Sequence, residues 1–310
     1  MKNILRSFNV SSFDAYPLHG ENVFGIETKN GDYILKRIVK NDYSYVRLLY
    51  EYRLSNFLHT EGIPVARPLK TCDGGNYLEC KNFYYVLMPK LPNTRPDYFS
   101  IQSAKIYESV GSGIARLNAS MARYPNTIRD WWHICVYYDF YRDVFPKIKN
   151  YVSAAEYNQL SLFFSSSRAE IKMIFGSYPL QLLHGDCHPK NICVSNNEVT
   201  GFIDCDLLPI GPRLYDLCYF LIHILMFYPD SMYDDAKTKI FLSLCPHSLA
   251  GYDSVACLTA YEKKAFFYLL LYIPLQYFTH KSEKNIDAYA DYQAFWWVLK
   301  NRDNLTGIKI

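Results

Sequence analysis

The sequence predicts an α+β protein of two lobes, in which a small antiparallel sheet with one helix precedes a larger, mostly helical lobe. Residues 14–40 and 77–88 contain short apolar runs separated by turn-forming residues, a pattern that is typical of β-hairpins. Pro89 and Pro92 then stiffen the chain and stop the sheet. From Ser103 onward, apolar residues recur at helical spacing.

The small lobe is expected to span residues 1–92 and the large lobe residues 93–310, because the paired prolines mark a natural boundary. Strands of the small lobe are predicted at Asn22–Thr28, Asp32–Ile38, Tyr77–Glu79 and Phe83–Met88. The Asn30-Gly31 pair between the first two strands is a signal for a hairpin turn. An amphipathic helix is predicted at Tyr43–His59.

Lys36 lies within the second of these strands, on the same face as Ile34, because side chains alternate along a strand. A lysine among apolar strand residues costs free energy unless it is paired. Glu51, in the middle of the predicted helix, is the candidate partner. A solvated Lys36 and a Glu51 on the helix surface remain the alternatives.

The large lobe shows helical patterns in several regions. One helix is predicted by the apolar repeat from Ile106 to Leu117 and another at Ala154–Ile174, while residues 214–305 are helical and apolar. Four tryptophans could stack on a sugar ring or a cation, although packing in the core is the preferred interpretation. They are Trp131, Trp132, Trp296 and Trp297.

A polar loop follows the apolar run 180–183. It carries, in chain order, His184, Gly185, Asp186, His188 and Asn191. A hairpin is predicted next, with strands at 192–194 and 199–203 and a turn at Asn196-Asn197, and it ends in Asp204. If the strands are antiparallel, Asn191 and Asp204 meet at the open end of the hairpin.

Three of these polar residues have the chemistry that phosphoryl transfer requires. A Mg²⁺ ion with bound phosphates takes one or two carboxylate or amide oxygens from the protein, which Asn191 and Asp204 can supply. Asp186, close by but off the metal, could accept a hydroxyl proton and direct the oxygen at phosphorus. An isolated His-Gly-Asp would be a turn in most proteins, so the prediction depends on the whole arrangement.

The motif HGD-x-H-P-x-N, followed by G-F-I-D and G-P-R-x-x-D-L, resembles the aminoglycoside phosphotransferase and choline kinase-like family, whose fold is that of the protein kinases. The resemblance covers about residues 18–220. It implies that Asp186 is the catalytic residue, that Asn191 and Asp204 are the Mg²⁺ ligands, and that Asp216 is a structural acid at the start of the next helix. His188 would brace the loop rather than act as a base.

In the small lobe, the resemblance assigns Lys36 to the α- and β-phosphates of ATP and Glu51 to the ion pair that fixes this lysine. Gly20 and Asn22 would belong to the loop that covers the phosphates. That loop is poor in glycine, because no full G-x-G-x-x-G occurs in the chain.

Two further expectations concern the adenine site and the metal site. Main-chain groups near Met88 and Lys90 resemble the kinase hinge and would bind adenine. After Asp204, the segment Cys205-Asp206-Leu207 departs from the family pattern. Asp206 could be a second metal or acceptor ligand or could be solvated, and the solvated state is preferred.

The expected function is an ATP- and Mg²⁺-dependent transfer of the γ-phosphate to a hydroxyl of a small molecule: a sugar, an amino-alcohol or an aminoglycoside. Asp216 follows Asp204 by only twelve positions, which leaves no room for the activation loop of a protein kinase. The C-terminal third has no marked acidic cluster, which weighs against a polycationic aminoglycoside. The alternative is a weak or inactive kinase-like protein that binds a nucleotide or a partner.

Composition limits the partners and the compartment. A formal charge of +3 without a basic block argues against nucleic acid. The nine cysteines lack the spacing of a zinc site, and several lie in apolar runs as small buried hydrophobes. The N-terminus lacks the apolar core of a signal peptide, and the longest apolar runs are shorter than the ~20 residues that span a bilayer. A cytoplasmic protein with no membrane partner is expected.

Overall fold

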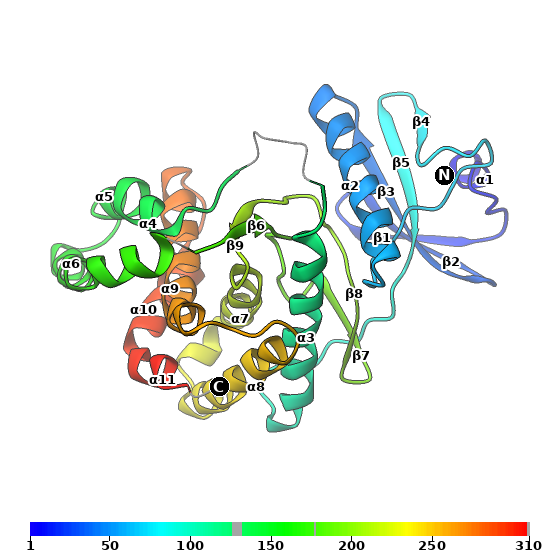
Figure 1. Ribbon diagram of the computed structural model, residues 1–310. Helices are drawn as coiled ribbons and strands as arrows, with labels where there is room; N and C mark the ends of the chain where they lie inside the picture. Colours follow the sequence, from blue (N-terminus) through cyan, green and yellow to red (C-terminus); the bar gives the residue numbers. More distant parts are fainter. Residues whose placement is uncertain (126–131, 177, 309–310) are drawn as a thin grey trace. The chain divides into compact units, whose positions relative to one another are not determined.

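The computed structural model describes residues 1–125, 132–176 and 178–308 (Figure 1). The chain divides into two compact units. Unit 1 comprises residues 1–94 and 200–206, and unit 2 comprises residues 95–199 and 207–310. The short segment 200–206 belongs by its contacts to unit 1, although it is covalently flanked on both sides by unit 2.

Unit 1 is built on one antiparallel sheet of five strands in the order β1-β2-β3-β5-β4. The strands are β1 (Asp14–His19), β2 (Val23–Thr28), β3 (Gly31–Val39), β4 (Leu78–Cys80) and β5 (Phe83–Pro89). The predicted antiparallel sheet is therefore confirmed, with strand ends within one residue of those expected for β2 to β5.

The hairpin turn between β2 and β3 differs by one residue from the prediction. Thr28 pairs with Gly31, so the central residues are Lys29 and Asn30 rather than Asn30 and Gly31. The Thr28 side chain explains the shift, because its hydroxyl accepts from the Asn30 N–H at 3.1 Å and donates to the Gly31 carbonyl at 2.8 Å. A threonine that bonds locally to the backbone in this way can fix a turn.

Helix α2 (Asp42–Thr60) covers one face of this sheet, as Figure 1 shows. Its start is fixed by a reciprocal capping box between Asn41 and Ser44. Leu48 of α2 packs with Val86 and Met88 of β5, and Ile34 and Ile38 of β3 join this cluster. Because side chains alternate along β3, Lys36 lies on this same α2-facing side.

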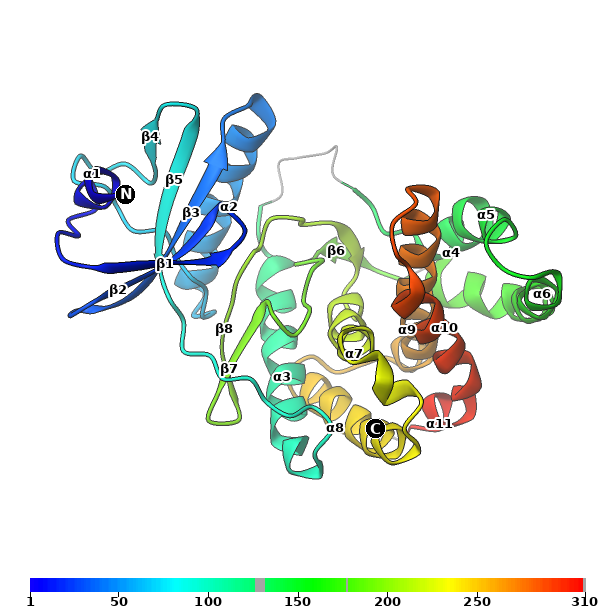
Figure 2. The same cartoon turned by 180° about the vertical axis from the view of Figure 1, so that it is seen from behind.

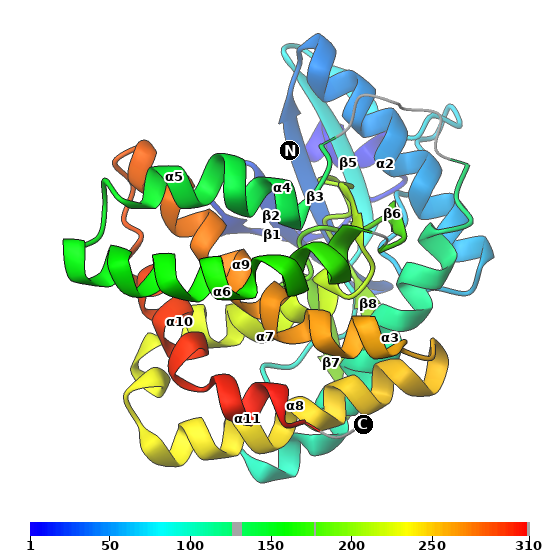
Figure 3. The same cartoon turned by 60° about the vertical axis from the view of Figure 1, so that its left-hand side comes forward.

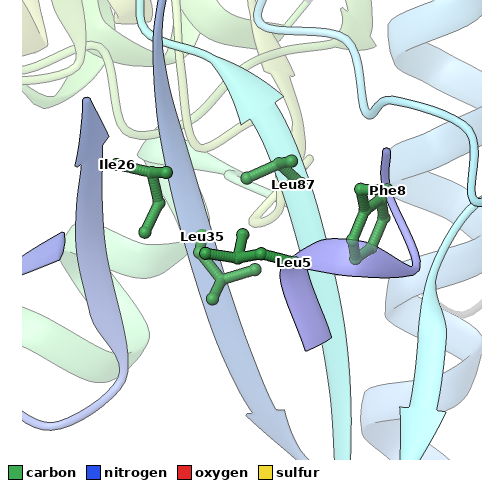
Figure 4. Close-up of a cluster of buried hydrophobic side chains, with 5 residues drawn as sticks. All are labelled: Leu5, Phe8, Ile26, Leu35 and Leu87. Carbon is green, nitrogen blue, oxygen red and sulfur yellow. The ribbon is translucent and has the colours of Figure 1, made fainter. Parts of the chain in front are cut away.

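The opposite face of the sheet is covered by the short helix α1 (Lys2–Arg6). Figure 4 shows that Leu5 and Phe8 pack against Ile26, Leu35 and Leu87 of three neighbouring strands. Burial of each such side chain stabilises the fold by about 1.5–3 kcal/mol. The sequence pattern does not predict α1, because five residues are too few to show a helical period.

Unit 2 is mostly helical, which confirms the predicted character of the large lobe (Figure 2). Its longer helices are α3 (Ala104–Met121), α6 (Ala154–Gly176), α7 (Tyr215–Phe227), α8 (Asp235–Val255), α9 (Ala260–Glu283) and α10 (Tyr289–Lys300). Its shorter helical segments are η1 (Ile101–Ser103), α4 (Val136–Tyr138), the π-helix η2 (Asp139–Val144), α5 (Phe145–Ile148), η3 (Pro229–Met232) and α11 (Arg302–Thr306).

Two small sheets frame the polar loop. Strand β6 (Leu180–Leu182) pairs antiparallel with β9 (Ile210–Pro212), and β7 (Ile192–Ser195) forms the second sheet with β8 (Glu198–Phe202). The turn residues Asn196 and Asn197 have φ angles of 54° and 64°. Two consecutive positive φ angles define the type I′ turn that favours asparagine, so the predicted hairpin is confirmed.

Helices α3 and α8 approach each other closely at a pair of glycines. A Cβ on Gly111 would lie 1.9 Å from the carbonyl oxygen of Ser248. A Cβ on Gly251 would lie 2.1 Å from the carbonyl oxygen of Glu108. No side chain fits between the two backbones, so both positions require glycine.

Asn118 of α3 connects this helix to the β6–β9 pair. Its side-chain amide donates to the Arg213 carbonyl at 2.7 Å, immediately after β9. The Gln181 side chain of β6 donates to the Asn118 carbonyl, also at 2.7 Å. Helix α3 therefore holds both strands that precede and follow the polar loop.

The helices of the 136–176 region pack on α9, as Figure 3 shows for α6. Phe140 of η2 contacts Phe164 of α6 with a ring-centroid separation of 4.9 Å and Tyr272 of α9 at 5.1 Å. This aromatic packing positions η2 opposite α9, where the two segments enclose the cavity described below.

Five of the nine cysteines are buried, as expected for small core hydrophobes. Within the described ranges, no helix combines the length and the apolar character needed to cross a membrane.

Candidate active site

The polar loop after β6 is anchored by a buried acid. The Asp216 carboxylate, in the first turn of α7, accepts the backbone N–H of Gly185 at 2.8 Å and that of His184 at 3.1 Å. Asp216 is fully buried. Its two oxygens thus fix the backbone of the residues that precede Asp186, which agrees with the structural role implied by the resemblance.

Gly185 holds the loop in a conformation that other residues do not tolerate. Its φ is +78°, and an added Cβ would lie 2.3 Å from Cδ of Pro209. Positive φ and the close contact act together, because a side chain would be strained by the backbone and would also displace Pro209.

Gly185→Ala is therefore expected to lower the free energy of unfolding by several kcal/mol, on the order of the combined cost of backbone strain and overpacking. Gly62→Ala is the matched control, because Gly62 has a φ of +77° and no atom within 4 Å of an added Cβ. Urea unfolding of both variants measures the difference. Equal losses in the two variants would show that the Pro209 contact is unimportant.

Asp186 has hydrogen-bond donors on both carboxylate oxygens. Tyr219 Oη donates to Oδ1 at 2.9 Å, and Asn191 Nδ2 donates to Oδ2 at 2.9 Å. The same Asn191 nitrogen donates to the Asp186 carbonyl at 3.0 Å. The carboxylate is thus held in one orientation while part of it remains accessible, since Asp186 is only partly buried.

Asn191 is buried, at 4% exposure, and its amide nitrogen is committed to Asp186. Its amide oxygen takes part in neither of those bonds. An amide oxygen beside carboxylates is a ligand that Mg²⁺ accepts, so the donor set of Asn191 fits the predicted role. The part of the chain that the structure describes contains no cluster of three or more His, Cys, Asp or Glu side chains arranged to hold a metal by themselves.

His188 supports the loop. Its Nδ1 accepts from the Lys190 N–H at 3.2 Å, and its ring packs against Phe227 and His223. Its Nε2 lies 3.7 Å from Asp186 Oδ2. Burial lowers the pKa of His188 below its usual value, although Asp186 opposes this effect. A largely neutral imidazole in van der Waals contact fits the expected bracing role.

Burial raises the pKa of Asp216 to about 6, against the opposing effects of His184 and the two N–H donors. The folded protein therefore keeps a proton on Asp216 between about pH 4 and pH 6, where the unfolded chain has lost it. The unfolded chain loses this proton more readily than the folded protein. The free energy of unfolding therefore falls by about 3 kcal/mol as the pH rises through this interval.

We expect Asp216→Asn to remove this pH dependence. The difference in unfolding free energy between wild type and variant should shift by about 3 kcal/mol between pH 4 and pH 7, with the wild type relatively more stable at pH 4. Urea unfolding at the two pH values measures the shift. A difference that is the same at both pH values would contradict the prediction.

In unit 1, Lys36 forms an ion pair with Asp204. Glu51, the expected partner, acts on Lys36 electrostatically without a direct ion pair among the described residues. Burial alone lowers the pKa of Lys36, but Glu51, Asp204 and Asp206 outweigh it and raise the pKa above its usual value. Burial also raises the pKa of Glu51, which Lys36 offsets in part.

The segment after β8 contains a residue with positive φ and a second ion pair. Asp204 has a φ of +59°, in the left-handed region that Asn and Asp adopt more readily than most other residues with a side chain. Asp206 forms an ion pair with Arg47 of α2. The preferred interpretation of Asp206 as solvated was wrong, because Arg47 binds it and burial raises its pKa.

The remaining predicted nucleotide residues lie at three places in unit 1. Met88 lines one small cavity of about 10 Å³ together with Lys36 and Glu51, so these three side chains come together. Asn22 lies beside the β2–β3 pair, and its side-chain oxygen accepts a hydrogen bond from Arg37 Nε at 3.1 Å. Arg37 follows Lys36 directly in the sequence. Gly20, with a φ of +51°, opens the same turn.

Lys90 lies at the other end of β3, with its Nζ 3.3 Å from both Tyr16 Oη and Asp32 Oδ2. Its backbone N–H donates to the Asp32 carbonyl at 2.9 Å. The resemblance implies that main-chain groups near Lys90 bind adenine. The N–H of Lys90 itself, however, is already used within the sheet.

Unit 2 contains a cavity of about 430 Å³ between the η2–α5 segment and α9. Its polar and aromatic lining includes Trp132, Asp139, Asp143, Gln276, Tyr277 and Glu283. The volume falls within the range of small-molecule sites.

One tryptophan lies in the core and one lines the cavity. Trp297 is buried and donates to Thr238 Oγ1 at 3.2 Å, which confirms the core interpretation for that residue. Trp132 is 44% exposed and lines the cavity, so the core interpretation was wrong there. Trp131 lies outside the described residues.

Tyr219 and Tyr277 were not predicted as site residues; they lie 58 residues apart in the sequence, and their hydroxyl groups are 2.9 Å apart. Tyr219 follows Asp216 by one helical turn, which places it near the polar loop. That spacing was the one available signal for Tyr219, and no local pattern indicates Tyr277.

A family model described as "Phosphotransferase enzyme family" matches residues 17–256 of this chain. Comparison with curated proteins found no match.

Solved structures share the fold at low sequence identity. An amicoumacin kinase, solved with AMP-PNP and Ca²⁺, is 16% identical, with a TM-score of 0.61 over 93% of this chain and 87% of the other. An aminoglycoside phosphotransferase from Alicyclobacillus acidocaldarius is 13% identical, with a TM-score of 0.67 over 99% and 93%. A microcompartment-associated aminopropanol kinase is 15% identical, with a TM-score of 0.66 over 99% and 98%. These similarities confirm the predicted kinase-like fold class.

Proposed function

The chain belongs to the phosphotransferase enzyme family, and from this premise we propose that it transfers the γ-phosphate of ATP to a hydroxyl group of a small molecule. The observation that carries the proposal is the Asp186 carboxylate, which is oriented by donors on both oxygens and sits in the polar loop fixed by Asp216. A carboxylate held in this way can orient a hydroxyl nucleophile.

Each predicted site residue has one role in this proposal. Asp186 accepts a hydrogen bond from the acceptor hydroxyl and takes its proton as the new P–O bond forms and the bond to ADP breaks. Lys36 binds the phosphates of the nucleotide. Asn191 and Asp204 would each supply an oxygen to Mg²⁺, which would neutralise phosphate charge when bound.

Glu51 stabilises the charge of Lys36, and the turn that contains Gly20 and Asn22 is proposed to cover the phosphates. Backbone groups near Met88 are proposed to contact the adenine. Because none of these residues forms a covalent intermediate, the rate enhancement comes from positioning and from charge stabilisation.

The cavity of about 430 Å³ in unit 2 is the proposed acceptor site. Tyr277 joins it to the polar loop, because Tyr277 lines the cavity and its hydroxyl lies 2.9 Å from that of Tyr219, which binds Asp186. Among the solved relatives, one is a spectinomycin phosphotransferase in complex with ADP and another is an aminopropanol kinase. These descriptions guide the choice of test acceptors.

The proposal is tested by measuring ADP release from Mg·ATP with a panel of sugars, amino-alcohols and aminoglycosides. Release that depends on one acceptor class supports the proposal, and mass spectrometry of the product should show one added phosphate. Nucleotide binding by calorimetry without any turnover would favour an inactive kinase-like protein. Absence of both nucleotide binding and turnover would exclude the proposed reaction.

A further inference from the structure

A turn, rather than a strand, presents the Asp204 carboxylate. Strand β8 ends at Phe202, whose N–H donates to the Pro64 carbonyl at 2.9 Å. Two residues later, Asp204 has a positive φ, and its carbonyl accepts the Asp206 N–H at 2.9 Å. A hydrogen bond between residues i and i+2 closes a three-residue turn. Asp204 and Asp206 are therefore the two ends of one tight turn, and a group that holds one end also constrains the other.

Side chains of unit 1 hold both ends of this turn. Lys36 of β3 pairs with Asp204, and Arg47 of α2 pairs with Asp206 through Nη2 and Oδ2. All four residues belong to unit 1. The Arg47 and Asp206 side chains are 33% and 25% exposed, so solvent screens their attraction less than that of a pair on the open surface. The turn thus has one attachment at each end.

The guanidinium of Arg47 supplies a constraint that Lys36 does not supply alone. A lysine ammonium is a point charge on a flexible stem, and it follows a carboxylate through many orientations. A guanidinium is planar, and its donors point in fixed directions. With Lys36 as the single attachment, the turn would be free to rotate about its contact at Asp204. The second attachment, at Asp206, removes this freedom.

Helix α2 places Arg47 beside the acid that acts on Lys36. Arg47 and Glu51 are four residues apart, so their side chains lie on the same face of the helix. Glu51 acts electrostatically on Lys36, and Arg47 acts on Glu51 in the same way. One turn of α2 therefore influences both cations that hold the turn, Lys36 at Asp204 and Arg47 at Asp206.

We infer that Arg47 is a positioning residue for the proposed metal ligand Asp204, and that it acts through Asp206, which stays off the metal. The inference rests on the proposed function, in which Asp204 supplies an oxygen to Mg²⁺. It gives a role to the segment after Asp204 that departs from the family pattern, because Asp206 becomes the point at which the turn is fixed. This role requires no contact between Arg47 and the metal or the nucleotide.

The test measures how strongly Mg²⁺ tightens nucleotide binding. Calorimetry gives the dissociation constant of AMP-PNP in EDTA and in excess Mg²⁺, and the ratio of the two constants is the metal enhancement. Arg47→Met and Asp206→Asn are compared with wild type, together with Arg47→Lys as the conservative variant. Arg53→Met is the control, because Arg53 lies on the same helix and is exposed. Unfolding midpoints are recorded for every variant.

Arg47→Met and Asp206→Asn should each lower the metal enhancement about tenfold and leave the metal-free affinity for AMP-PNP within about threefold of wild type. The shared direction decides between explanations, because the two substitutions change the local charge in opposite ways. If the pair acted by charge alone, Arg47→Met would raise the enhancement. The same rise is expected if Asp206 is itself a metal ligand, since the substitution would free its carboxylate.

The conservative and double variants extend the comparison. Arg47→Lys should recover part of the loss, because it restores the charge without the planar donors. The variant that combines Arg47→Met with Asp206→Asn should lose no more than about tenfold, because both substitutions break the same contact. Losses that multiply to about a hundredfold would contradict a common route.

The inference is overturned if Arg47→Met raises the metal enhancement or leaves it unchanged. A general loss of the nucleotide site belongs to the second case, because it weakens AMP-PNP binding equally in EDTA and in Mg²⁺. Failure of the proposed function looks different. The wild type then binds no AMP-PNP, or binds it equally well with and without Mg²⁺, and the inference falls with it.

Discussion

Asp186→Asn should lower kcat by about three orders of magnitude while the affinity for ATP stays within about twofold of wild type. The asparagine amide cannot take the acceptor proton. It also cannot satisfy both neighbouring donors, because one of Tyr219 Oη and Asn191 Nδ2 will face its NH₂ group. Orientation and proton acceptance are therefore lost together, whereas no nucleotide contact is assigned to this residue.

Initial-rate assays for kcat and calorimetry with ATP measure the two quantities separately. Asp230→Asn serves as the control, since Asp230 is an exposed carboxylate of η3 in the same unit and should leave kcat unchanged. Unchanged turnover in Asp186→Asn would remove Asp186 from the mechanism. A parallel loss of ATP binding would point to a collapsed loop rather than to a missing base.

Lys36→Met should lower kcat/KM for ATP by about two to three orders of magnitude, because it deletes a cation that the proposed function places on the phosphates. Methionine preserves most of the apolar stem of the side chain. The substitution also removes the ion pair with Asp204 and the charge that stabilises ionised Glu51. Some loss of stability should therefore accompany the loss of activity.

Lys40→Met is the matched control for this substitution. Lys40 also forms an ion pair, with Glu79, but this pair is open to solvent through Glu79, whose side chain is 59% exposed. An exposed pair contributes about 0–1 kcal/mol, so the control should change neither kcat/KM nor the unfolding midpoint appreciably. If both variants retain full activity, Lys36 is not the phosphate-binding residue.

The pH dependence of ATP binding provides a further check on Lys36. Its pKa is raised by Glu51, Asp204 and Asp206 against the effect of burial, so the lysine stays charged throughout the range up to about pH 10. The contribution of its charge to stability is complete at neutral pH and is lost only as the pH rises through the raised pKa. ATP affinity in the wild type should therefore show no fall between pH 7 and pH 9.

The sequence predicted those parts of the fold and site that are encoded over short distances. The β7–β8 hairpin was predicted because Asn196-Asn197 supplies two residues that tolerate positive φ. The faces of β3 were predicted because strand alternation places Ile34 and Lys36 together. Likewise, the turn between β2 and β3 was placed one residue too late because the hydroxyl of Thr28 competes with the Asn-Gly preference.

Contacts between side chains that are far apart in the sequence could not be predicted in the same way. Strand alternation indicates that Lys36 faces α2, yet several acids are within reach of that face, and the ion pair forms with Asp204. Arg47 and Asp206 are 159 residues apart, and each looks like an ordinary surface charge in sequence. The Tyr219–Tyr277 pair depends on how α7 packs on α9, which single-sequence periodicity does not specify.

The glycine contacts between α3 and α8 have a consequence for inherited variation in this protein. The atoms nearest to an added Cβ at Gly111 or Gly251 belong to helices α8 and α3, not to the polar loop, but α3 carries Asn118, which holds the strands on either side of that loop. A single methyl group at residue 111 would push two helices apart and tilt those strands. Alleles altered at either glycine would thus behave as loss-of-function alleles, although every residue of the proposed site is unchanged.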